Sequence, residues 1–318
     1  MAWKIAHAMP RPACAAVLLA GLILAVLAPP ASVRAEPVTI RHDSGETTLP
    51  DRPKKIAVFD LSALDTLDAL GVSVAGVPDF RMPPRLARYE GRGYARIGTL
   101  FEPDYEAVSA LEPDLIIVGG RSRARYAELS RIAPTVDFSG DEHDPYRADL
   151  RNITTLGRIF GKEDAAAALI AKLDASVAAL RSKAAGAGKG LFVLATGGRL
   201  STYGSGGRFG ILHDVFGIAQ AAPDIKPGIH GQPISFEFIA KVDPDWLFVL
   251  DRDAAIGRSA QGQSAQALLD NELVARTKAW KAGQVVYLDA ASWYLAGAGI
   301  RSLQGEVDHL AEAFARKR

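Results

Sequence analysis

The sequence feature that most constrains the fold is a segment that occurs twice, at a constant offset of 131 residues. The copies are EAVSALEPDLIIVGGR at residues 106–121 and EFIAKVDPDWLFVLDR at residues 237–252. Each copy begins with a Glu seven residues before a Pro-Asp pair and ends with an Arg eight residues after that Pro. The pattern predicts a short amphipathic helix, a stop at the Pro, and a buried strand whose carboxyl end lies near the Arg.

The repetition predicts an α/β fold of two similar lobes. A Pro-Asp pair before an apolar strand is ordinary in α/β chains, so a single copy would carry little weight. Two copies with matching Glu and Arg positions favour a structural repeat. Ligands of open α/β sheets gather at the carboxyl ends of the strands. We therefore expect Arg121 and Arg252 to face each other across a cleft between the lobes.

Helical periodicity dominates the middle of the chain. Apolar residues recur at helical spacing over residues 145–160 and 164–184, and Gly161 lies between the two stretches. A long helix here would be a rigid strut that joins the lobes. The predicted organisation is a signal peptide, an N-terminal α/β lobe, linking helices and a C-terminal α/β lobe, at residues 1–35, 36–143, 144–186 and 187–318 respectively.

Each lobe is expected to begin with a buried strand, KIAVFD at residues 55–60 and GLFVLATG at residues 190–197, followed by a helix. Other parts of the chain carry weaker signals for secondary structure. They predict a hairpin that turns at Gly45, a helix at 62–70, a strand at 72–77, an irregular loop at 78–98, a helix at 123–132 and a helix at 302–318 that closes the second lobe.

The first 35 residues have the parts of a cleavable secretory signal. Lys4 and Arg11 precede an apolar run at residues 13–27, and Val33 and Ala35 supply the small residues before a cleavage site. A membrane anchor is the alternative, but the run is shorter than the ~20 residues that a spanning helix needs. We expect cleavage after Ala35 and export to the periplasm.

The mature chain is expected to be soluble and free of disulfides. The single cysteine, Cys14, precedes the apolar run, whereas an acylated lipoprotein cysteine would follow it. Removing the signal lowers the count of Lys and Arg from 37 to 34 against 36 Asp and Glu, which leaves a net charge of −2. This balance gives no general attraction for nucleic acid or an anionic membrane, so any anion binding must be local.

No enzyme motif is complete in the sequence. The segment GSGGRFG at residues 204–210 resembles a dinucleotide-binding loop, but Phe209 occupies the third glycine position and no acidic residue follows at the expected distance. Ser205 follows Tyr203 by two residues, so the glycine pattern around a hydrolase nucleophile is absent. The sequence also contains no Walker loop, no HExxH and no pair of cysteines.

Several residues on predicted loops at the strand ends are candidates for an anion-binding site. Each has an ordinary alternative: a paired or solvated Arg, a polar loop His, or a Tyr packed beside Trp293. Three guanidinium groups around one space repel each other unless an anion occupies it. Each arginine at ~6 Å from such an anion gains roughly 2 to 3 kcal/mol of attraction at an effective dielectric near 20. The candidates are Arg121, Arg208, Arg252, His230 and Tyr294.

Seven segments resemble the periplasmic binding proteins of ferric-siderophore ABC importers, most closely the enterochelin-type members. They are VFDLSALDTLDALG, EPDLIIVGGR, GGRFGILHDVFG, GIHG, VLDR, ARTKAW and WYLAGAG. The resemblance extends over essentially the whole mature chain. The two-lobed, helix-linked plan is shared with haem, cobalamin and hydroxamate binders, whereas these segments are typical of the subgroup. The signal is the one departure, because it resembles that of a soluble protein and not of a lipoprotein.

The resemblance implies that an arginine triad, Arg121, Arg208 and Arg252, holds a ferric catecholate. It also implies that His230 and Tyr294 bind iron directly when the siderophore supplies only four donors. Fe(III) is hard and octahedral, so four catecholate oxygens, a phenolate and an imidazole would fill its coordination sphere. A hexadentate chelate would leave no open position. The ferric siderophore would then be the transported ligand, and we expect no permanently bound cofactor.

The resemblance further implies that Glu106 and Glu237, one on each lobe, dock to arginines of an ABC permease. A solvated helix glutamate is the alternative for both. We expect a monomeric binding protein and no enzyme. Haem or cobalamin binding on the same fold is a second hypothesis, with His230 and Tyr294 as axial ligands of haem. A secreted iron-dependent enzyme is a third, against which the missing carboxylate ligand counts.

Overall fold

The computed structural model describes residue 1 and residues 37–140, 144–258 and 263–316. The chain divides into two compact units, Met1–Arg34 and Ala35–Arg318, and the description below concerns the second. Apart from Met1, the predicted signal peptide at residues 1–35, with Cys14, lies outside the described residues. Within the described part of the chain, no helix is both long and apolar enough to cross a membrane.

A five-stranded parallel sheet forms the centre of the first lobe, in the order β5-β4-β3-β6-β7. Its central strands β3 and β6 are apolar and buried at every position, as expected for a parallel sheet with both faces covered. Ile56 lies opposite Leu115 in their register. The strands are β3 (Ile56–Val58), β4 (Gly76–Val77), β5 (Ala95–Arg96), β6 (Leu115–Val118) and β7 (Thr135–Asp137).

Three predictions for the first lobe were wrong in detail. The strand expected at 72–77 shortens to β4. The loop expected at 78–98 contains β5 and a 3-10 helix, η1 (Pro84–Glu90), because Arg85 and Arg88 of this helix face carboxylates of the preceding α-helix. The helix expected at 123–132 is a 3-10 turn, η2 (Arg123–Arg125), followed by the short α3 (Tyr126–Leu129). Directly after α3, the Ser130 hydroxyl donates to the Tyr126 carbonyl, a bond that competes with helix continuation.

A six-stranded sheet of mixed direction forms the centre of the second lobe, in the order β11-β9-β8-β12-β13, with β10 paired to β8. Strand β8 is parallel to β12 and antiparallel to β9. The β8–β9 hairpin turns at Gly197 and Gly198, whose φ angles of 53° and 76° suit a two-residue hairpin turn. The lobes are therefore less alike than the repeat predicts. The strands are β8 (Lys189–Thr196), β9 (Arg199–Thr202), β10 (Ala219–Gln220), β11 (Gln232–Ile234), β12 (Trp246–Asp251) and β13 (Val285–Tyr287).

Helices follow most of these strands along the chain. In the first lobe they are α1 (Leu61–Ala69) and α2 (Tyr105–Leu111), beside η1, η2 and α3. In the second lobe they are α6 (Ile211–Asp214), α7 (Phe236–Val242), α8 (Arg252–Ala255), α9 (Ala265–Leu269), α10 (Glu272–Ala275), α11 (Lys278–Lys281) and α12 (Ala290–Leu295).

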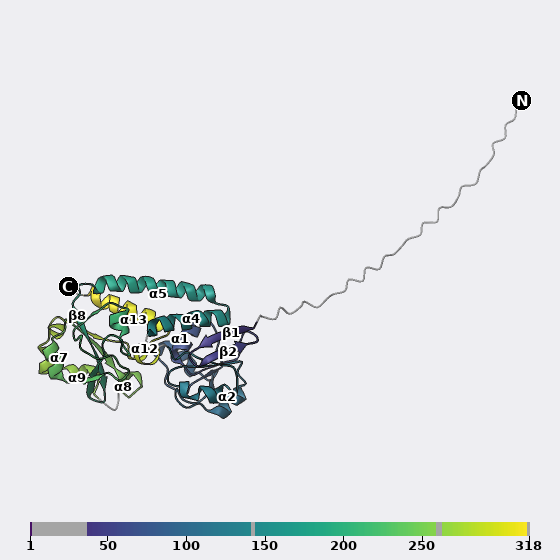
Figure 1. The fold of residues 1–318 in the computed structure, drawn as a ribbon, viewed down its shortest axis with the longest axis horizontal. Helices are drawn as coiled ribbons and strands as arrows, with labels where there is room; N and C mark the ends of the chain where they lie inside the picture. Colours follow the sequence, from purple (N-terminus) through teal and green to yellow (C-terminus); the bar gives the residue numbers. More distant parts are fainter. Residues whose placement is uncertain (2–36, 141–143, 259–262, 317–318) are drawn as a thin grey trace. The chain divides into compact units, whose positions relative to one another are not determined.

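Two helices connect the sheets, as the periodicity predicts. They are α4 (Pro145–Phe160) and α5 (Glu163–Ala184), separated by Gly161 with a φ of 61°. Helix α5 packs against α4 and against the last helix, α13 (Ile300–Ala315), and Figure 1 shows it as the long helix beside α13. The alternating α/β elements and this helical connection confirm the predicted fold class.

Helix α13 is bound to the first lobe as well as to α5. Asp65 of α1 accepts hydrogen bonds from the backbone N–H groups of Arg301 (2.8 Å) and Ser302 (3.1 Å), and Arg301 also pairs with Asp68. Carboxylates are favoured at a helix N-terminus because the free N–H groups there carry partial positive charge. The expectation that this helix only closes the second lobe was therefore incomplete.

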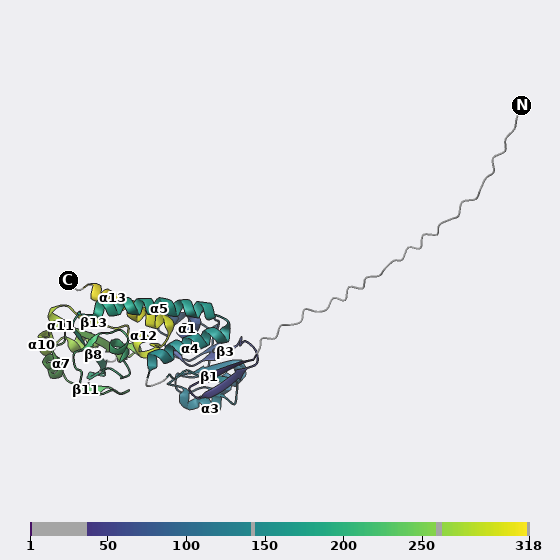
Figure 2. The ribbon, with the colours of Figure 1, turned by 45° about the horizontal axis from the view of Figure 1, so that its top comes forward.

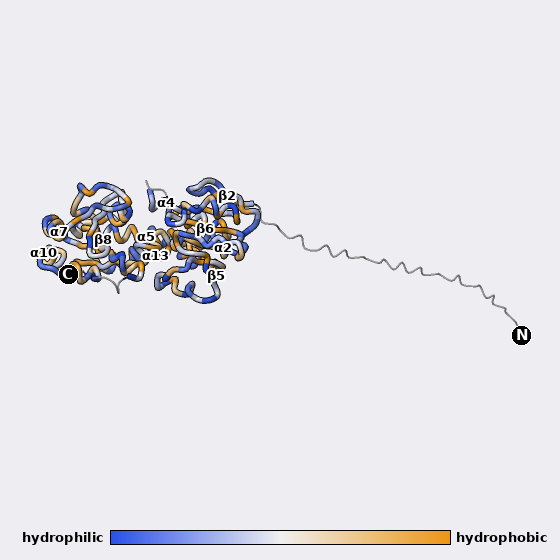
Figure 3. Tube along the Cα trace, turned by 90° about the horizontal axis from the view of Figure 1, so that it is seen from below, coloured by the Kyte–Doolittle hydropathy of each residue, from blue (hydrophilic) through white to orange (hydrophobic). Residues whose placement is uncertain are grey.

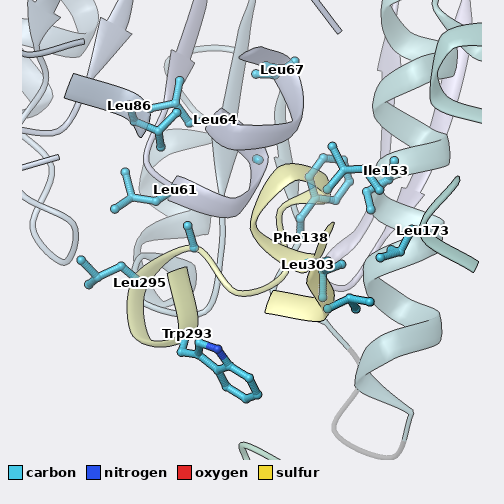
Figure 4. Close-up of a cluster of buried hydrophobic side chains, with 14 of the residues drawn as sticks. Leu61, Leu64, Leu67, Leu86, Phe138, Ile153, Leu173, Trp293, Leu295 and Leu303 are labelled. Carbon is cyan, nitrogen blue, oxygen red and sulfur yellow. The ribbon is translucent and has the colours of Figure 1, made fainter. Parts of the chain in front are cut away.

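The main hydrophobic cluster includes residues of both lobes and of α5 and α13. Figure 4 shows Leu61 and Leu64 of α1 on one side and Leu295 of α12 and Leu303 of α13 on the other. Each fully buried Leu contributes about 1.5 to 3 kcal/mol of transfer free energy. Residues coloured as hydrophobic (orange) also gather around β6 in Figure 3. The packing therefore continues from one lobe to the other.

The predicted hairpin forms as β1 (Val38–His42) and β2 (Gly45–Leu49) and lies beside the first sheet (Figure 2), but it turns at residues 43–44, directly before Gly45. The Ser44 hydroxyl donates to the buried Asp137 carboxylate at 2.5 Å, and the Thr47 hydroxyl donates to the Thr135 carbonyl at 2.6 Å. These bonds fasten the hairpin to β7.

Candidate functional site

The two copies of the repeated segment adopt the same local structure. Asp104 caps α2 by accepting from Ala107 N, and Ser235 caps α7 by accepting from Phe238 N. Both helices are seven residues long. A polar side chain at the N-cap satisfies an N–H group that has no partner within the helix. The N-caps lie two residues before the starts of the segments recognised in the sequence.

The helix ends also match. Glu112 (φ 49°) and Asp243 (φ 45°) end α2 and α7 in the left-handed conformation, and they are the only non-glycine residues with positive φ in the described chain. After the shared Pro, Asp114 accepts from Lys55 N at 2.8 Å and Asp245 accepts from Lys189 N at 2.7 Å. Each Asp thereby ties the repeat to the first strand of its own lobe. The repeat thus fixes where β6 and β12 end, and with them Arg121 and Arg252.

Arg121 follows β6 and reaches from the first lobe to the C-terminal end of α12. Its Nη2 donates to the Tyr294 carbonyl at 2.6 Å and its Nη1 to the Leu295 carbonyl at 3.3 Å. Burial, together with repulsion from Arg208, lowers the pKa of Arg121 below its ordinary value, while the charge of Asp60 acts in the opposite direction. An arginine stays protonated in spite of such a shift. Arg121 is therefore a partly buried cation at the end of α12.

Arg252 is the first residue of α8 and lies against the same tyrosine. Its Nε donates to the Tyr294 hydroxyl at 2.7 Å, and its guanidinium carbon lies 5.5 Å from the centre of the Tyr294 ring. The preceding Asp251 caps α8 by accepting from Ala254 N, which holds the start of the helix in place. The side chain of Arg252 is 32% exposed, so solvent reaches it.

Arg208 lies in the glycine-rich turn before α6 and stacks on two aromatic rings. Its guanidinium carbon is 4.5 Å from the Tyr294 ring centre and 5.0 Å from that of Phe209. Its Nη2 also donates to the Tyr294 carbonyl at 3.4 Å. Phe209 stacks on Phe192 of β8 with ring centres 4.8 Å apart, so the turn rests on the core. Arg208 itself is exposed.

Tyr294 is the common neighbour of the three arginines. Burial alone would raise the pKa of its phenol, but the hydrogen bond from Arg252 and the charges of Arg208 and Arg252 lower it below the ordinary value. Positive charge near a phenol favours phenolate. The structure thus brings together four of the five candidates, in a cluster that suits an anionic ligand and a phenolate donor to a hard metal ion.

His230, the fifth candidate, lies on an exposed loop between β10 and β11. Among the described residues, no hydrogen bond or ion pair joins His230 to the arginines or to Tyr294. Its loop is nevertheless attached to the site, because Arg208 N donates to the Gly228 carbonyl at 3.2 Å. Gly231 packs so closely on Tyr203 that an added Cβ would lie 2.6 Å from the ring. The role of His230 as an iron ligand stays a prediction.

The two candidate docking residues are both exposed. Glu106 lies in the first turn of α2 and Glu237 in the first turn of α7. A hydrogen bond from Ser235 lowers the pKa of Glu237, so this carboxylate is charged at neutral pH. Neither carboxylate forms an ion pair with another described residue.

Comparison with known proteins identifies the family. A family model described as periplasmic binding protein matches residues 56–291. The chain belongs to this family. The petrobactin-binding protein YclQ of Bacillus subtilis is 41% identical over 273 residues, which cover 84% of this chain and 85% of that protein. The ferric-anguibactin-binding protein FatB of Vibrio anguillarum is 34% identical over 284 residues, which cover 87% and 88% of the two chains.

Solved structures of family members agree with this assignment. The crystal structure of YclQ superposes with a TM-score of 0.84 at 38% identity, over 88% of this chain and 99% of that chain. The periplasmic catecholate-siderophore binding protein VctP of Vibrio cholerae gives a TM-score of 0.82 at 34% identity, over 87% of this chain and all of that chain. These relatives are binding proteins by name, and the periplasmic binding protein fold is confirmed for this chain.

Sequence reasoning missed several residues that support the site. Asp60 follows β3, caps α1 through Ala63 N (2.7 Å), and its charge raises the pKa of Arg121 against the effect of burial. Burial raises its pKa, and the bond to Ala63 N and the charge of Arg121 act against that rise. An acidic residue at the carboxyl end of a buried strand was the available signal. Asp65 and Asp68 gave no signal, because their bonds to the start of α13 join residues more than 230 positions apart and their other arginine partners lie on the unpredicted η1.

Proposed function

We propose that this protein captures an anionic ferric catecholate siderophore and delivers it to an ABC permease without chemical turnover. The observation that carries the proposal is the convergence of Arg121, Arg208 and Arg252 on Tyr294. Guanidinium groups present several donors in a fixed plane and suit clustered oxygen anions. Relatives named for ferric anguibactin and catecholate siderophores support this ligand class.

The charge of the cluster favours a multiply charged chelate over a neutral one. Arg121, Arg208 and Arg252 have no ion pair among the described residues except the 4.0 Å contact of Arg252 with Asp253. Each arginine at ~6 Å from an anionic centre would contribute roughly 2 to 3 kcal/mol at an effective dielectric near 20. Because Arg208 and Arg252 are partly or fully exposed, salt will weaken this attraction.

For a tetradentate chelate, we propose that Tyr294 and His230 complete the coordination of Fe(III). The lowered pKa of the Tyr294 phenol supports this role, because iron binds the phenolate. His230 lies on the exposed loop next to the Arg208 turn, from which a small loop movement would bring it toward the ligand. A hexadentate chelate would leave both residues as pocket lining. The iron complex is the cargo, and the protein holds no permanent cofactor.

For delivery, we propose that Glu106 and Glu237 dock to cationic residues of the permease. Their matching positions on α2 and α7 support this pairing. We further propose that the mature protein is a periplasmic monomer released by cleavage after Ala35. Uptake of the ferric siderophore by cells that depend on this protein should fall in Glu106→Ala and Glu237→Ala variants, with ligand affinity unchanged. A parallel loss of affinity would contradict a docking role.

A titration of the purified mature protein tests the ligand. Ferric tetradentate and hexadentate catecholates, haem and cobalamin would each be added while tryptophan quenching and the charge-transfer band are recorded. We expect ferric catecholates to bind with a Kd well below about 1 μM, which corresponds to roughly −8 kcal/mol. The proposal is wrong if no ferric catecholate reaches that affinity, or if haem or cobalamin binds more tightly.

A further inference from the structure

The segment at residues 78–98 carries more arginines than the first lobe uses. Arg85 faces Asp65 at 3.7 Å and Arg88 pairs with Asp68. Arg96 donates to the Tyr89 carbonyl at 3.0 Å. For the remaining two, no hydrogen bond or ion pair occurs within the described part of the chain, and both are exposed. In order, the five are Arg81, Arg85, Arg88, Arg92 and Arg96, and the two without a partner are Arg81 and Arg92.

The backbone around Arg81 is fixed, although its side chain has no polar partner. Met82 N donates to the Glu90 carboxylate at 2.8 Å, and Asp79 N donates to the Gly98 carbonyl at 2.6 Å. The Met82 side chain is buried at 4% exposure. Arg81 is therefore held at a defined place on the first lobe, with only its side chain free to move.

The Arg81 side chain reaches the second lobe at the helix that carries Arg252. A Cβ added to Gly257 would lie 3.4 Å from both Cδ and Nη1 of Arg81, so the two residues are in contact. Gly257 has a φ of 74° and follows α8, whose first residue is Arg252. Gly257 lies five residues after Arg252 and two residues past the end of α8, so this contact is close in sequence to Arg252.

On the second-lobe side of this contact, the one acidic residue of α8 is already engaged, whereas on the first-lobe side the exposed Asp79 and the Glu90 carboxylate lie in the same segment as Arg81. Asp253, the acidic residue of α8, already accepts from Gly197 N at 2.7 Å and lies 4.0 Å from Arg252. Helix α8 packs against α12, which carries Tyr294. The Arg81 guanidinium, which has no ion pair among the described residues, adds positive potential at the end of α8, and an anion bound there would relieve its repulsion with Arg252.

We propose that Arg81 is a further ligand-binding arginine, which spans the two lobes beside α8 and selects ferric chelates of higher negative charge. This inference rests on the proposed function and deepens it. Arg81 acts mainly through charge at the exposed rim, so its effect scales with the charge of the ligand. At about 10 Å in water, one positive charge strengthens binding of a trianion about eightfold and of a monoanion about twofold before salt screening.

Affinities for two probes of different charge test the inference. A ferric bis-catecholate has a net charge of −1 and a ferric tris-catecholate one of −3, since each catecholate contributes −2 against Fe(III). At low ionic strength we expect Arg81→Gln to weaken tris-catecholate binding about four- to eightfold and bis-catecholate binding at most about twofold, and to make the salt dependence of trianion binding shallower. Arg81→Lys keeps the charge and should stay within about twofold of the parent for both probes.

Arg92→Gln is the matched control, because it removes the same charge from the same segment at a residue with no described contact to the second lobe. Both variants should keep the parent Tm. The inference is overturned if Arg81→Gln binds the trianion as tightly as the parent does, or if its affinity falls equally for both probes. It is also overturned if Arg92→Gln shows the same change in selectivity. If the parent binds neither chelate, the proposed function itself fails, which is a different result from any of these.

Discussion

Arg121 of the first lobe donates a hydrogen bond of 2.6 Å to the carbonyl of Tyr294, across 173 positions of sequence. The same arginine reaches the Leu295 carbonyl, so it caps the C-terminal end of α12. The hydroxyl of the same tyrosine accepts from Arg252 of the second lobe. The backbone carbonyl of Tyr294 also accepts from Arg208 of the second lobe, so arginines of both lobes meet at this residue.

Replacing Arg121 by Gln should lower both stability and ligand affinity. The change removes two bonds from a charged, partly buried donor to carbonyls at a helix end, which costs about 1 to 3 kcal/mol. Urea unfolding measures the stability, and tryptophan quenching measures the affinity for a ferric catecholate. Arg96→Gln is the control, because Arg96 also donates to a carbonyl, that of Tyr89, but only within the first lobe. Equal affinities for the two variants would contradict a ligand role for Arg121.

The pKa of the Tyr294 phenol should rise when Arg252 is changed. In the parent, the Arg252 hydrogen bond and nearby positive charge outweigh burial and hold this pKa below its ordinary value. In Arg252→Gln, tyrosinate should therefore appear at higher pH, by about one pKa unit for each 1.4 kcal/mol of lost phenolate stabilisation. Ultraviolet difference absorbance follows the titration, with Tyr294→Phe identifying the signal of this residue. An unchanged titration would show that Arg252 does not act on the phenol.

Tyr294→Phe should discriminate between chelates. The variant keeps the ring on which Arg208 stacks but loses the oxygen that would bind iron. We expect the tetradentate ferric catecholate to bind at least about tenfold more weakly, a change of about 1.4 kcal/mol, and the hexadentate complex to change little. Loss of the charge-transfer band only in the tetradentate complex would identify phenolate ligation. Equal losses for the two complexes would remove that role.

Glu306→Gln should stabilise the protein at neutral and alkaline pH. Glu306 of α13 is 3% exposed, and its Oε1 has no hydrogen-bond partner among the residues that the structure describes. Burial together with nearby acids such as Asp149 raises its pKa well above the ordinary value. The folded state then keeps a proton that the unfolded chain releases near pH 4.5, so the free energy of unfolding falls as pH rises above that value.

Glu306→Gln removes this loss of unfolding free energy, which is about 1.4 kcal/mol for each unit by which the pKa of Glu306 is raised. The Tm difference between variant and parent should therefore grow from pH 4 to pH 8, as measured by thermal unfolding. Glu312→Gln, on an exposed position of the same helix, is the control and should show no such growth. A constant difference across this range would mean that Glu306 titrates normally.

Asp65→Ala should loosen the attachment of α13 to the first lobe. The Asp65 carboxylate is 1% exposed and accepts from two N–H groups at the start of α13. Leaving these buried donors without a partner costs about 2 to 4 kcal/mol in total. Urea unfolding measures the loss, and Asp308→Ala on the exposed face of α13 should cost far less. A stability equal to that of the control would contradict the anchoring role.

The local parts of the fold could be predicted because their signals are local. The repeated helix and strand, the stop of α4 at Gly161 and the buried face of α13 follow from spacing, capping residues and glycine alone. The hairpin at Gly197 was missed, although two adjacent glycines between apolar runs favour such a turn. The 3-10 helix η1 could not be predicted, because ion pairs with α1 hold it in place.

The sequence by itself determined two α/β halves, a helical connection between them, and an arginine at the end of one strand in each half. Only the tertiary structure decided that Arg121, Arg208 and Arg252 meet at Tyr294, and that α13 is bound to α1. Periodicity and capping act over a few residues, whereas these contacts join positions separated by 42 to 236 residues. Such pairs depend on how the sheets, α12 and α13 pack, and no local pattern in the chain specifies that packing.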